Sequence, residues 1–198
     1  MGRRVELLEE MVASRRENTL TYACDISEMD EFDRALEAMT GELGSLDIAI
    51  LCAGIGELNP VLDASAEIET ARVNVDGWTN AAVGLYRLFE RQGWGQLVTV
   101  TSVGGLMSAA MAPAYSASKA YQINYTKALQ RKSNGTGVVV TEIRPGLVDT
   151  RMAKDDGLFW VMPVDKVASQ IVKAIARRRR LAVVSRRWRL ANYILRHI

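Results

Sequence analysis

The pattern of hydrophobic and polar positions switches repeatedly along the chain between helical spacing and continuous apolar runs. Apolar residues at 4–13 fall on one helical face, and a second stripe runs from Phe32 to Leu43. Ser27 is placed to cap that second helix, and Gly44 to end it. Further helices are predicted at residues 64–91, 113–132, 165–179 and 187–195, and strands at 19–24, 46–54, 96–102, 137–143 and 181–184.

The alternation of strands and helices predicts an α/β fold, a parallel sheet with helices on both faces. The run 46–54 is apolar almost throughout, as expected of a strand covered on both sides. The 198 residues are enough for one domain, and residues 184–198 form a basic, amphipathic tail. Ligands of such folds bind beyond the carboxyl ends of the strands.

Charge is distributed unevenly, although the net charge is only +2. The first 165 residues carry fifteen basic and twenty-three acidic groups, whereas the last thirty-three carry ten basic groups and no acidic one. A solvated helix end and tail is the simpler interpretation. The alternative is an anionic partner or a weak contact with a membrane surface.

The expected cellular location is inferred from the absence of membrane-spanning and signal-peptide patterns in the sequence and from its two cysteines. No apolar run reaches the length of about eighteen residues that would indicate a membrane-spanning helix, and the first residues do not resemble a signal peptide. Cys24 and Cys52 lie in apolar, strand-like runs, so we expect both to be reduced and buried. The expected location is the cytosol.

Candidate chemistry centres on the sequence YSASK, residues 115–119. Pro113 marks a helix start, so Tyr115 and Lys119 share one face of that helix. An ammonium about 4 Å from a phenol interacts by roughly 4 kcal/mol at an effective dielectric near 20, enough to lower the pKa of the tyrosine. Such a tyrosine can act as a general acid or base, although pairs of this spacing are also common on ordinary helix surfaces.

Two more polar residues accompany that pair. Ser102 ends a predicted strand just before Gly104 and Gly105, where its hydroxyl would face a ligand crevice. Asn74 lies among poor helix formers inside a predicted helix, which indicates a local irregularity with free backbone groups.

Ser102, Tyr115-x-x-x-Lys119, Asn74 and the Pro145-Gly146 turn together resemble the short-chain dehydrogenase/reductase family, in the same order and spacing. The resemblance implies a Rossmann-like, doubly wound sheet and a carbonyl–alcohol oxidoreductase. It implies that Tyr115 exchanges a proton with the substrate, that Lys119 lowers the pKa of Tyr115 and binds the nicotinamide ribose, and that Ser102 polarises the carbonyl. Asn74 would hold a water that links the lysine to solvent.

The same resemblance implies cofactor contacts. Arg3 and Arg4 match a turn that recognises the 2′-phosphate, so NADP(H) is preferred over NAD(H). Cys52 stands where the family has an asparagine in an Asn-Ala-Gly turn, so its neighbour strands would be less tightly joined. The remaining cofactor residues implied are Asp25, Ile26, Ala53, Gly54, Tyr115, Lys119, Pro145, Gly146, Val148 and Thr150.

The substrate implied is a small carbonyl or alcohol compound. Ser102, Gly104 and Tyr115 would contact it, and Phe159 and Trp160 would face it from a lid at 151–163, unless these aromatic residues simply pack on the core. The resemblance implies a homodimer or homotetramer, with helices 64–91 and 113–132 at subunit interfaces. No metal site and no nucleic-acid partner are expected.

The family's first strand, its glycine-rich turn and most of its second strand have no counterpart before Arg3. The sheet is therefore expected to be incomplete at its N-terminal side, and strand 46–54 to have a bare edge unless strand 19–24 or another chain pairs with it. We expect weak NADP(H) binding, because that turn normally receives the pyrophosphate. A non-catalytic remnant that acts as an assembly or regulatory partner is the alternative function.

Overall fold

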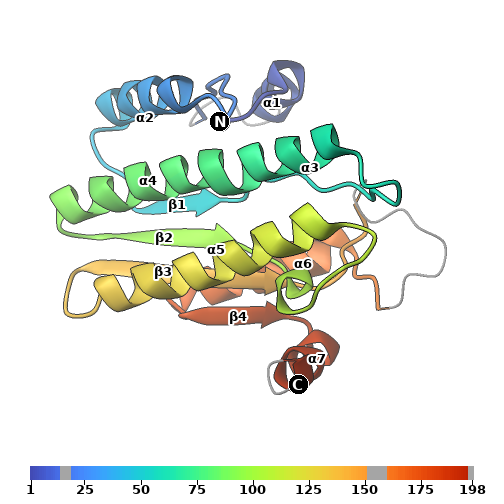
Figure 1. Cartoon of the computed structure of the whole chain (residues 1–198). Helices are drawn as coiled ribbons and strands as arrows, with labels where there is room; N and C mark the ends of the chain where they lie inside the picture. Colours follow the sequence, from blue (N-terminus) through green and yellow to red (C-terminus); the bar gives the residue numbers. More distant parts are fainter. Residues whose placement is uncertain (14–18, 151–159, 196–198) are drawn as a thin grey trace.

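The computed structural model describes residues 1–13, 19–150 and 160–195 (Figure 1). The helices are α1 (Val5–Ala13), α2 (Met29–Leu43), α3 (Ala64–Ala71), α4 (Trp78–Gln92), α5 (Pro113–Lys132), α6 (Val164–Ala176) and α7 (Arg186–Leu195). The strands are β1 (Ile48–Leu51), β2 (Gly95–Val100), β3 (Val138–Pro145) and β4 (Leu181–Val184). A π-helical turn, Arg72–Gly77, joins α3 to α4, and a short 3-10 turn, Val103–Leu106, follows β2.

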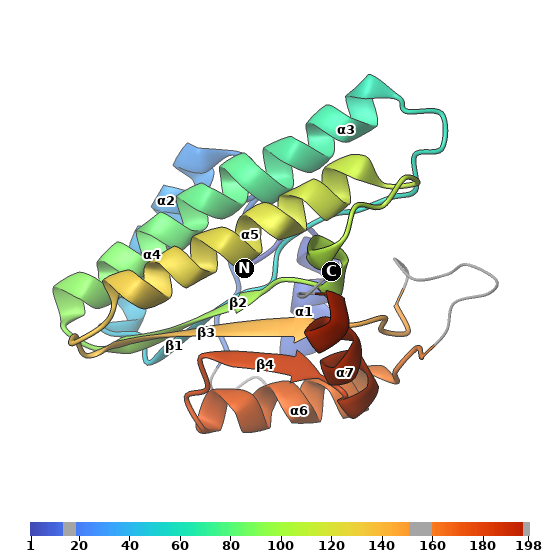
Figure 2. The same cartoon turned by 60° about the horizontal axis from the view of Figure 1, so that its bottom comes forward.

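The four strands form one parallel sheet in the order β1-β2-β3-β4. The predicted α/β class is confirmed, with α4 and α5 over one face of the sheet and α6 over the other (Figure 2). β2 and β3 lie at the centre, where Leu97, Val98 and Ile143 are fully buried. Both strands are buried along most of their length, polar residues such as Thr99, Thr141 and Glu142 included, because helices cover both faces of the sheet.

The predicted strand at 19–24 is wrong in extent. Only a parallel bridge between Gly2 and Ala23 forms there, with the Gly2 amide donating to Tyr22 and the Cys24 amide donating to Gly2. Ser27 does not cap α2, because its amide and hydroxyl both donate to the carboxylate of Asp25, and Glu28 is the residue that precedes the helix. Gly44 ends α2 as predicted, with a φ of 73° that favours glycine.

β1 is not covered on both faces, contrary to the expectation from its sequence. Ile48 and Ile50 are 47% and 54% exposed, whereas Ala49 and Leu51 are buried. Among the described residues, β1 pairs only with β2, so its other edge is open there, as predicted. Cys52 follows this strand and is exposed rather than buried, because it lies at the same open side, while Cys24 is buried as predicted.

A buried ion pair within β3 is hydrogen-bonded to α7. Glu142 accepts from the Arg144 Nε at 2.8 Å and from the Thr101 hydroxyl at 2.8 Å, and Arg144 Nη1 donates to the amide oxygen of Asn192 at 2.7 Å. Arg144 is fully buried and Glu142 nearly so. In the part of the chain that the structure describes, no helix is both long and apolar enough to cross a bilayer.

Candidate active site

Ser102 and Tyr115 meet where β2 ends and α5 begins. Pro113 occupies the first turn of α5, where its missing amide hydrogen costs no helical bond, so the predicted start and end of this helix are confirmed. Ser102 follows β2 in extended conformation and accepts a hydrogen bond from the Gly104 amide at 3.0 Å. A Cβ on Gly104 would lie 3.4 Å from both the Ser102 hydroxyl and the Tyr115 ring, so the three residues are in direct contact.

The phenol of Tyr115 titrates above its ordinary range. Burial raises its pKa, and a hydrogen bond with Ser102 offsets part of that effect. This differs from the expected lowering by Lys119, because the ammonium lies 5.8 Å from the ring centroid in a buried setting that disfavours the phenolate. At neutral pH the phenol is therefore protonated and able to donate.

Lys119 lies buried on the inner face of α5. Burial lowers its pKa to about 8, since the charged form loses its hydration. The ammonium donates to Gln122 Oε1 at 2.9 Å and makes a long contact of 3.5 Å with the carbonyl of Val100. A lysine with a pKa of about 8 is mostly charged at neutral pH, yet it can release and take up a proton beside the tyrosine far more readily than an ordinary lysine.

Gln122 connects Lys119 to Asn74, a link that was not anticipated from the sequence. The side chain is fully buried, and its Nε2 donates to the backbone carbonyl of Asn74 at 2.9 Å. A polar residue three positions after Lys119, on the inner face of an otherwise well-packed helix, was the available signal. Lys119 and Asn74 are thus joined directly through one amide group.

Asn74 itself is held by the π-helical turn, which confirms the predicted irregularity. Its side chain accepts from the Ile55 amide at 2.8 Å and donates to the Ile55 carbonyl at 2.7 Å and to the Ser118 hydroxyl at 3.0 Å. The side chain therefore fixes the loop after β1 against α5. That loop is close-packed at Gly56, where a Cβ would come within 2.3 Å of the Tyr115 ring.

A cavity of about 1070 Å³ lies between the N-terminal segment and the open side of β1. Its wall is largely apolar and includes the predicted cofactor residues Arg3, Arg4, Ile26, Ala53 and Gly54.

Asp25 lies beside this cavity and pairs with Arg3 at 3.4 Å. Hydrogen bonds from Ser27 and the charge of Arg3 outweigh its burial and keep its pKa below the ordinary value. Gly54 approaches Lys119 closely, since a Cβ there would lie 3.3 Å from the Lys119 ammonium. One cavity therefore runs between the basic N-terminal residues and the neighbourhood of Lys119.

The turn after β3 holds the other predicted cofactor residues. Pro145 ends the strand, and Gly146 packs so closely on the Trp188 ring that a Cβ would lie 2.2 Å from it. Val148 forms a bridge with Met162, and the Thr150 hydroxyl donates to the Val148 carbonyl at 3.3 Å.

Trp160, which was predicted to face the substrate, packs against Trp188 of α7. Its ring stands edge-to-face against Trp188, with centroids 5.7 Å apart, and its carbonyl accepts from the Trp188 indole. Phe159, the other aromatic residue predicted to face the substrate, lies outside the described residues.

Comparison with known proteins agrees with this arrangement. The family model described as short chain dehydrogenase matches residues 1–158. The chain belongs to the short-chain dehydrogenase family. Within the family, a probable oxidoreductase, EphD, of Mycobacterium tuberculosis is 30% identical over 149 residues, which are 74% of this chain and 25% of that protein. An acetoacetyl-CoA reductase of Allochromatium vinosum is 27% identical over 160 residues, 80% of this chain and 62% of the reductase.

Solved structures share the fold. The apo form of LigD from a Sphingobium strain superimposes with a TM-score of 0.82 at 23% identity, covering 97% of this chain and 80% of LigD. An alcohol dehydrogenase from Thermococcus sibiricus, complexed with 5-hydroxy-NADP, has a TM-score of 0.77 at 18% identity, covering 92% and 82% of the two chains. The chain thus spans only a quarter to about three fifths of the two curated relatives named above.

Two groups of residues lining the cavity fit the nicotinamide cofactor that the family binds. Gly54 leaves room beside Lys119 and Asn74, because a side chain there would crowd both polar groups at 3.1–3.3 Å. Arg3 and Arg4 place two cations on the wall of the cavity, a donor set suited to a phosphate. Among the described residues that line the cavity, no helix N-terminus with a glycine-rich turn is present to receive a pyrophosphate.

Proposed function

We propose that the chain forms the proton-transfer half of an NADP(H)-dependent oxidoreductase that interconverts a carbonyl and an alcohol. The observation that carries the proposal is the contact of Ser102 with Tyr115 next to buried Lys119, whose pKa is lowered to about 8. The names of its relatives, which include oxidoreductases and reductases, support the reaction class. The substrate proposed is a small carbonyl or alcohol compound.

Ser102, Tyr115 and Lys119 would each have a separate role in carbonyl reduction. The hydroxyls of Ser102 and Tyr115 together would hold and polarise the carbonyl oxygen. The protonated phenol of Tyr115 would donate its proton to that oxygen as negative charge develops, since its raised pKa keeps the phenol protonated at neutral pH. The Lys119 ammonium then stabilises the phenolate and returns a proton to it.

NADP(H) would supply the hydride when bound, and the protein would position it. Lys119 and Gly54 would adjoin its nicotinamide ribose, and Arg3 and Arg4 its 2′-phosphate. Asp25, Ile26, Ala53 and the turn Pro145–Thr150 complete the proposed contacts. The preference for NADP(H) over NAD(H) rests on the two arginines, and the 5-hydroxy-NADP complex of a protein with the same fold is consistent with it.

Turnover and binding test the proposal separately. We expect millimolar NADPH to support reduction of at least one member of a panel of small ketones and aldehydes, and Tyr115→Phe to abolish it without changing the circular dichroism spectrum. Retained turnover in Tyr115→Phe would refute the catalytic assignment. In a fluorescence titration, NADPH should bind more tightly than NADH but weakly. Tight binding would refute the importance given to a pyrophosphate-binding turn.

The assembly proposed is a homodimer or homotetramer in the cytosol, with residues 64–91 (α3 and α4) and 113–132 (α5) at the subunit interfaces. The two cysteines of the described chain are free thiols, as expected in a reducing compartment. Light scattering coupled to size exclusion would measure the mass of the assembly. No observation favours the non-catalytic alternative, because the tyrosine, lysine and serine stand together in a family of oxidoreductases.

A further inference from the structure

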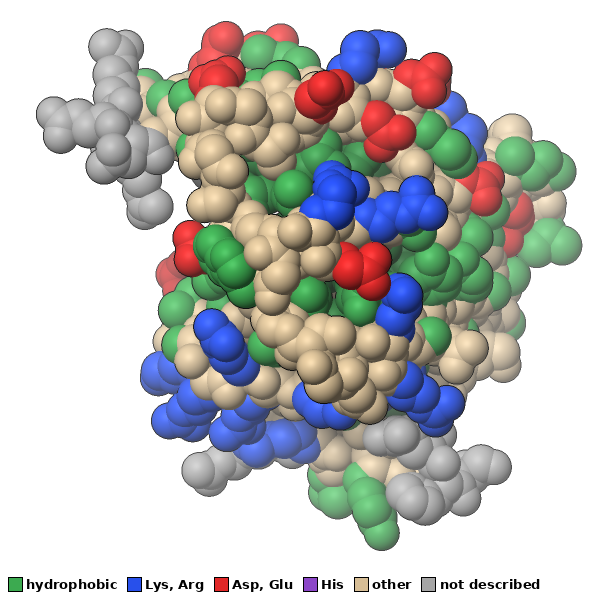
Figure 3. All heavy atoms as spheres, turned by 90° about the vertical axis from the view of Figure 1, so that its left-hand side faces the viewer, with side chains coloured by type: hydrophobic (Ala, Val, Ile, Leu, Met, Phe, Trp, Pro, Cys, Tyr) green, Lys and Arg blue, Asp and Glu red, His purple; other side chains and the backbone are tan. Residues whose placement is uncertain are grey.

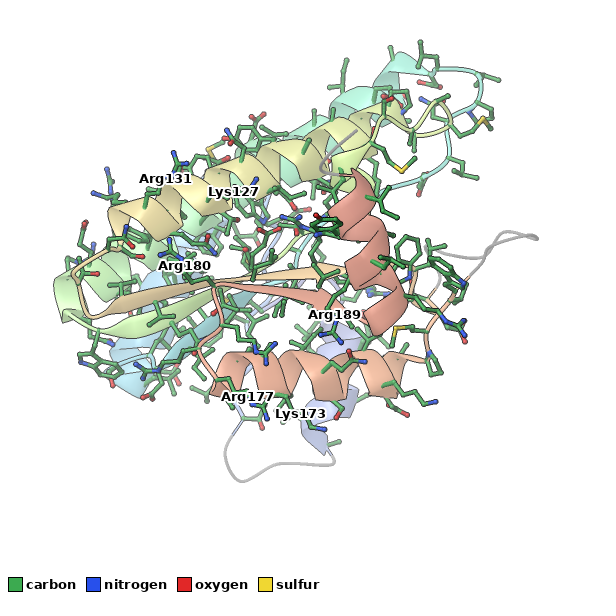
Figure 4. All side chains as sticks on the ribbon, turned by 90° about the horizontal axis from the view of Figure 1, so that it is seen from below. Lys127, Arg131, Lys173, Arg177, Arg180 and Arg189 are labelled. Carbon is green, nitrogen blue, oxygen red and sulfur yellow. The ribbon has the colours of Figure 1, made fainter. Side chains whose placement is uncertain are left out.

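Basic side chains from four parts of the chain gather around β4, the last strand of the sheet (Figure 4). Seen from below, they lie on both sides of this strand and toward α7. We call the set the basic face: Lys127 and Arg131 of α5, Lys173 and Arg177 at the end of α6, Arg180 before β4, and Arg189 of α7.

The basic face has almost no acidic counterpart. α5, β4 and α7 contain no Asp or Glu, and the one acid of α6, Asp165, lies in its first turn, at the end away from Arg177. Arg180 is bonded to neutral partners, the Asn134 side chain and the Gln130 carbonyl. Within the described chain, Arg131 and Arg177 make no ion pair with a carboxylate.

The charge of the face therefore has one sign. In the side view of Figure 3, Lys and Arg gather along the lower part of the molecule, whereas Asp and Glu lie mostly in the upper half. A surface of this kind attracts an anionic partner and repels a second copy of itself.

Exposed apolar side chains accompany these cations. α7 is held on the body by Trp188 and Asn192, which are both 7% exposed. Its other side presents Leu190 and Ile194, 61% and 48% exposed, beside Arg189. On α6, Val172 is 64% exposed next to Lys173. Apolar and basic side chains on one exposed helix side are typical of helices that lie in a membrane interface, which favours a lipid surface over nucleic acid as the anionic partner.

We propose that the basic face and the outer side of α7 bind the surface of an anionic lipid bilayer. The chain would rest on the headgroups without crossing them, with Leu190 and Ile194 reaching the acyl boundary and the arginines on the lipid phosphates. The basic tail alone pointed in this direction in the sequence, but the structure adds Lys127 and Arg131 of α5. The proposal is independent of the oxidoreductase function, and it requires that Lys127 and Arg131, in the last turns of α5, stay outside the proposed subunit interface.

Vesicle flotation tests it with a matched pair of variants. The protein should float with phosphatidylcholine vesicles that contain phosphatidylserine, should not float with pure phosphatidylcholine, and should be released by high salt. Each cation near such a surface strengthens binding about five-fold, so Arg131→Gln/Arg177→Gln should bind about 25-fold more weakly.

The control is Arg4→Gln/Arg34→Gln, which removes the same charge from the α1–α2 side, opposite β4 in Figure 1, and should bind like the unaltered protein. Leu190→Gln/Ile194→Gln should weaken binding at constant charge. Circular dichroism checks that each variant is folded. Equal flotation with and without phosphatidylserine, an equal loss in both arginine pairs, or binding to duplex DNA in place of vesicles would each overturn the proposal.

Discussion

Gln122→Leu isolates the one strong hydrogen bond that the Lys119 ammonium makes within the described structure. The donor–acceptor distance is 2.9 Å, and the remaining contact, to the Val100 carbonyl, is long at 3.5 Å. A hydrogen bond to a charged group contributes about 1.5–3 kcal/mol, and about 1.4 kcal/mol corresponds to one pH unit. Loss of the acceptor disfavours the charged lysine, so its titration midpoint should fall by about one to two pH units from a starting pKa of about 8.

Carbon NMR of protein labelled at the lysine ε-carbon measures this midpoint directly, and Lys119→Met assigns the resonance by its disappearance. Gln122→Glu should move the midpoint upward, because a carboxylate beside the ammonium favours its charged form. Gln130→Leu is the matched control, since Gln130 is also a buried glutamine of α5 but bonds the Val140 and Arg180 carbonyls instead. An unchanged midpoint in Gln122→Leu, or an equal fall in Gln130→Leu, would refute the role given to Gln122.

Three further outcomes follow from close contacts and buried charges. Gly56→Ala should lower NADPH-dependent turnover about a hundred-fold with the fold retained, because the new methyl group displaces the Tyr115 ring; unchanged kcat/KM would contradict this. Arg144→Met should lower the free energy of unfolding in urea by about 3–5 kcal/mol, because Glu142 is left buried and unpaired; a loss under about 1 kcal/mol would contradict it. The folded-state pKa of Lys119 lies below its unfolded value of 10.5, so the unfolded chain binds more protons than the folded one between about pH 8 and 10.5. The free energy of unfolding should therefore rise with pH over this range, by about 3 kcal/mol, and Lys119→Met should lack that rise.

Much of the fold could be predicted because local signals and burial agree. Pro113 marks the start of α5, and β2 and β3 could be located from their valine, leucine and isoleucine residues, which the helices on both faces of the sheet bury. The irregular turn around Asn74 was visible as a cluster of poor helix formers, and it became a π-helix. The order of Ser102, Tyr115 and Lys119 along the chain also predicted their meeting, since strand ends and helix starts converge at one edge of a parallel sheet.

The errors arise where a residue depends on neighbours distant in sequence. The run 19–24 has the composition of a strand but forms only a bridge, because its pairing partner among the described residues is Gly2 alone. Cys52 belongs to an apolar run, yet it is exposed because β1 is open on one side. Gln122 could not be assigned a role from the sequence, since one of its two hydrogen-bond partners, the Asn74 carbonyl, lies 48 residues earlier in the chain.

The attachment of α1 has a consequence for measurements of ligand binding. In the described chain, the polar links that join residues 1–13 to the rest are the backbone bonds of Gly2 with Tyr22 and Cys24 and the Arg3–Asp25 pair. So few links predict that the amide hydrogens of α1 exchange with solvent through local opening, well before those of β2 and β3. A ligand held by Arg3 and Arg4 would slow that exchange in proportion to its occupancy, even at amides that it never contacts. Deuterium uptake in α1 should therefore report whether a ligand occupies the cavity beside β1.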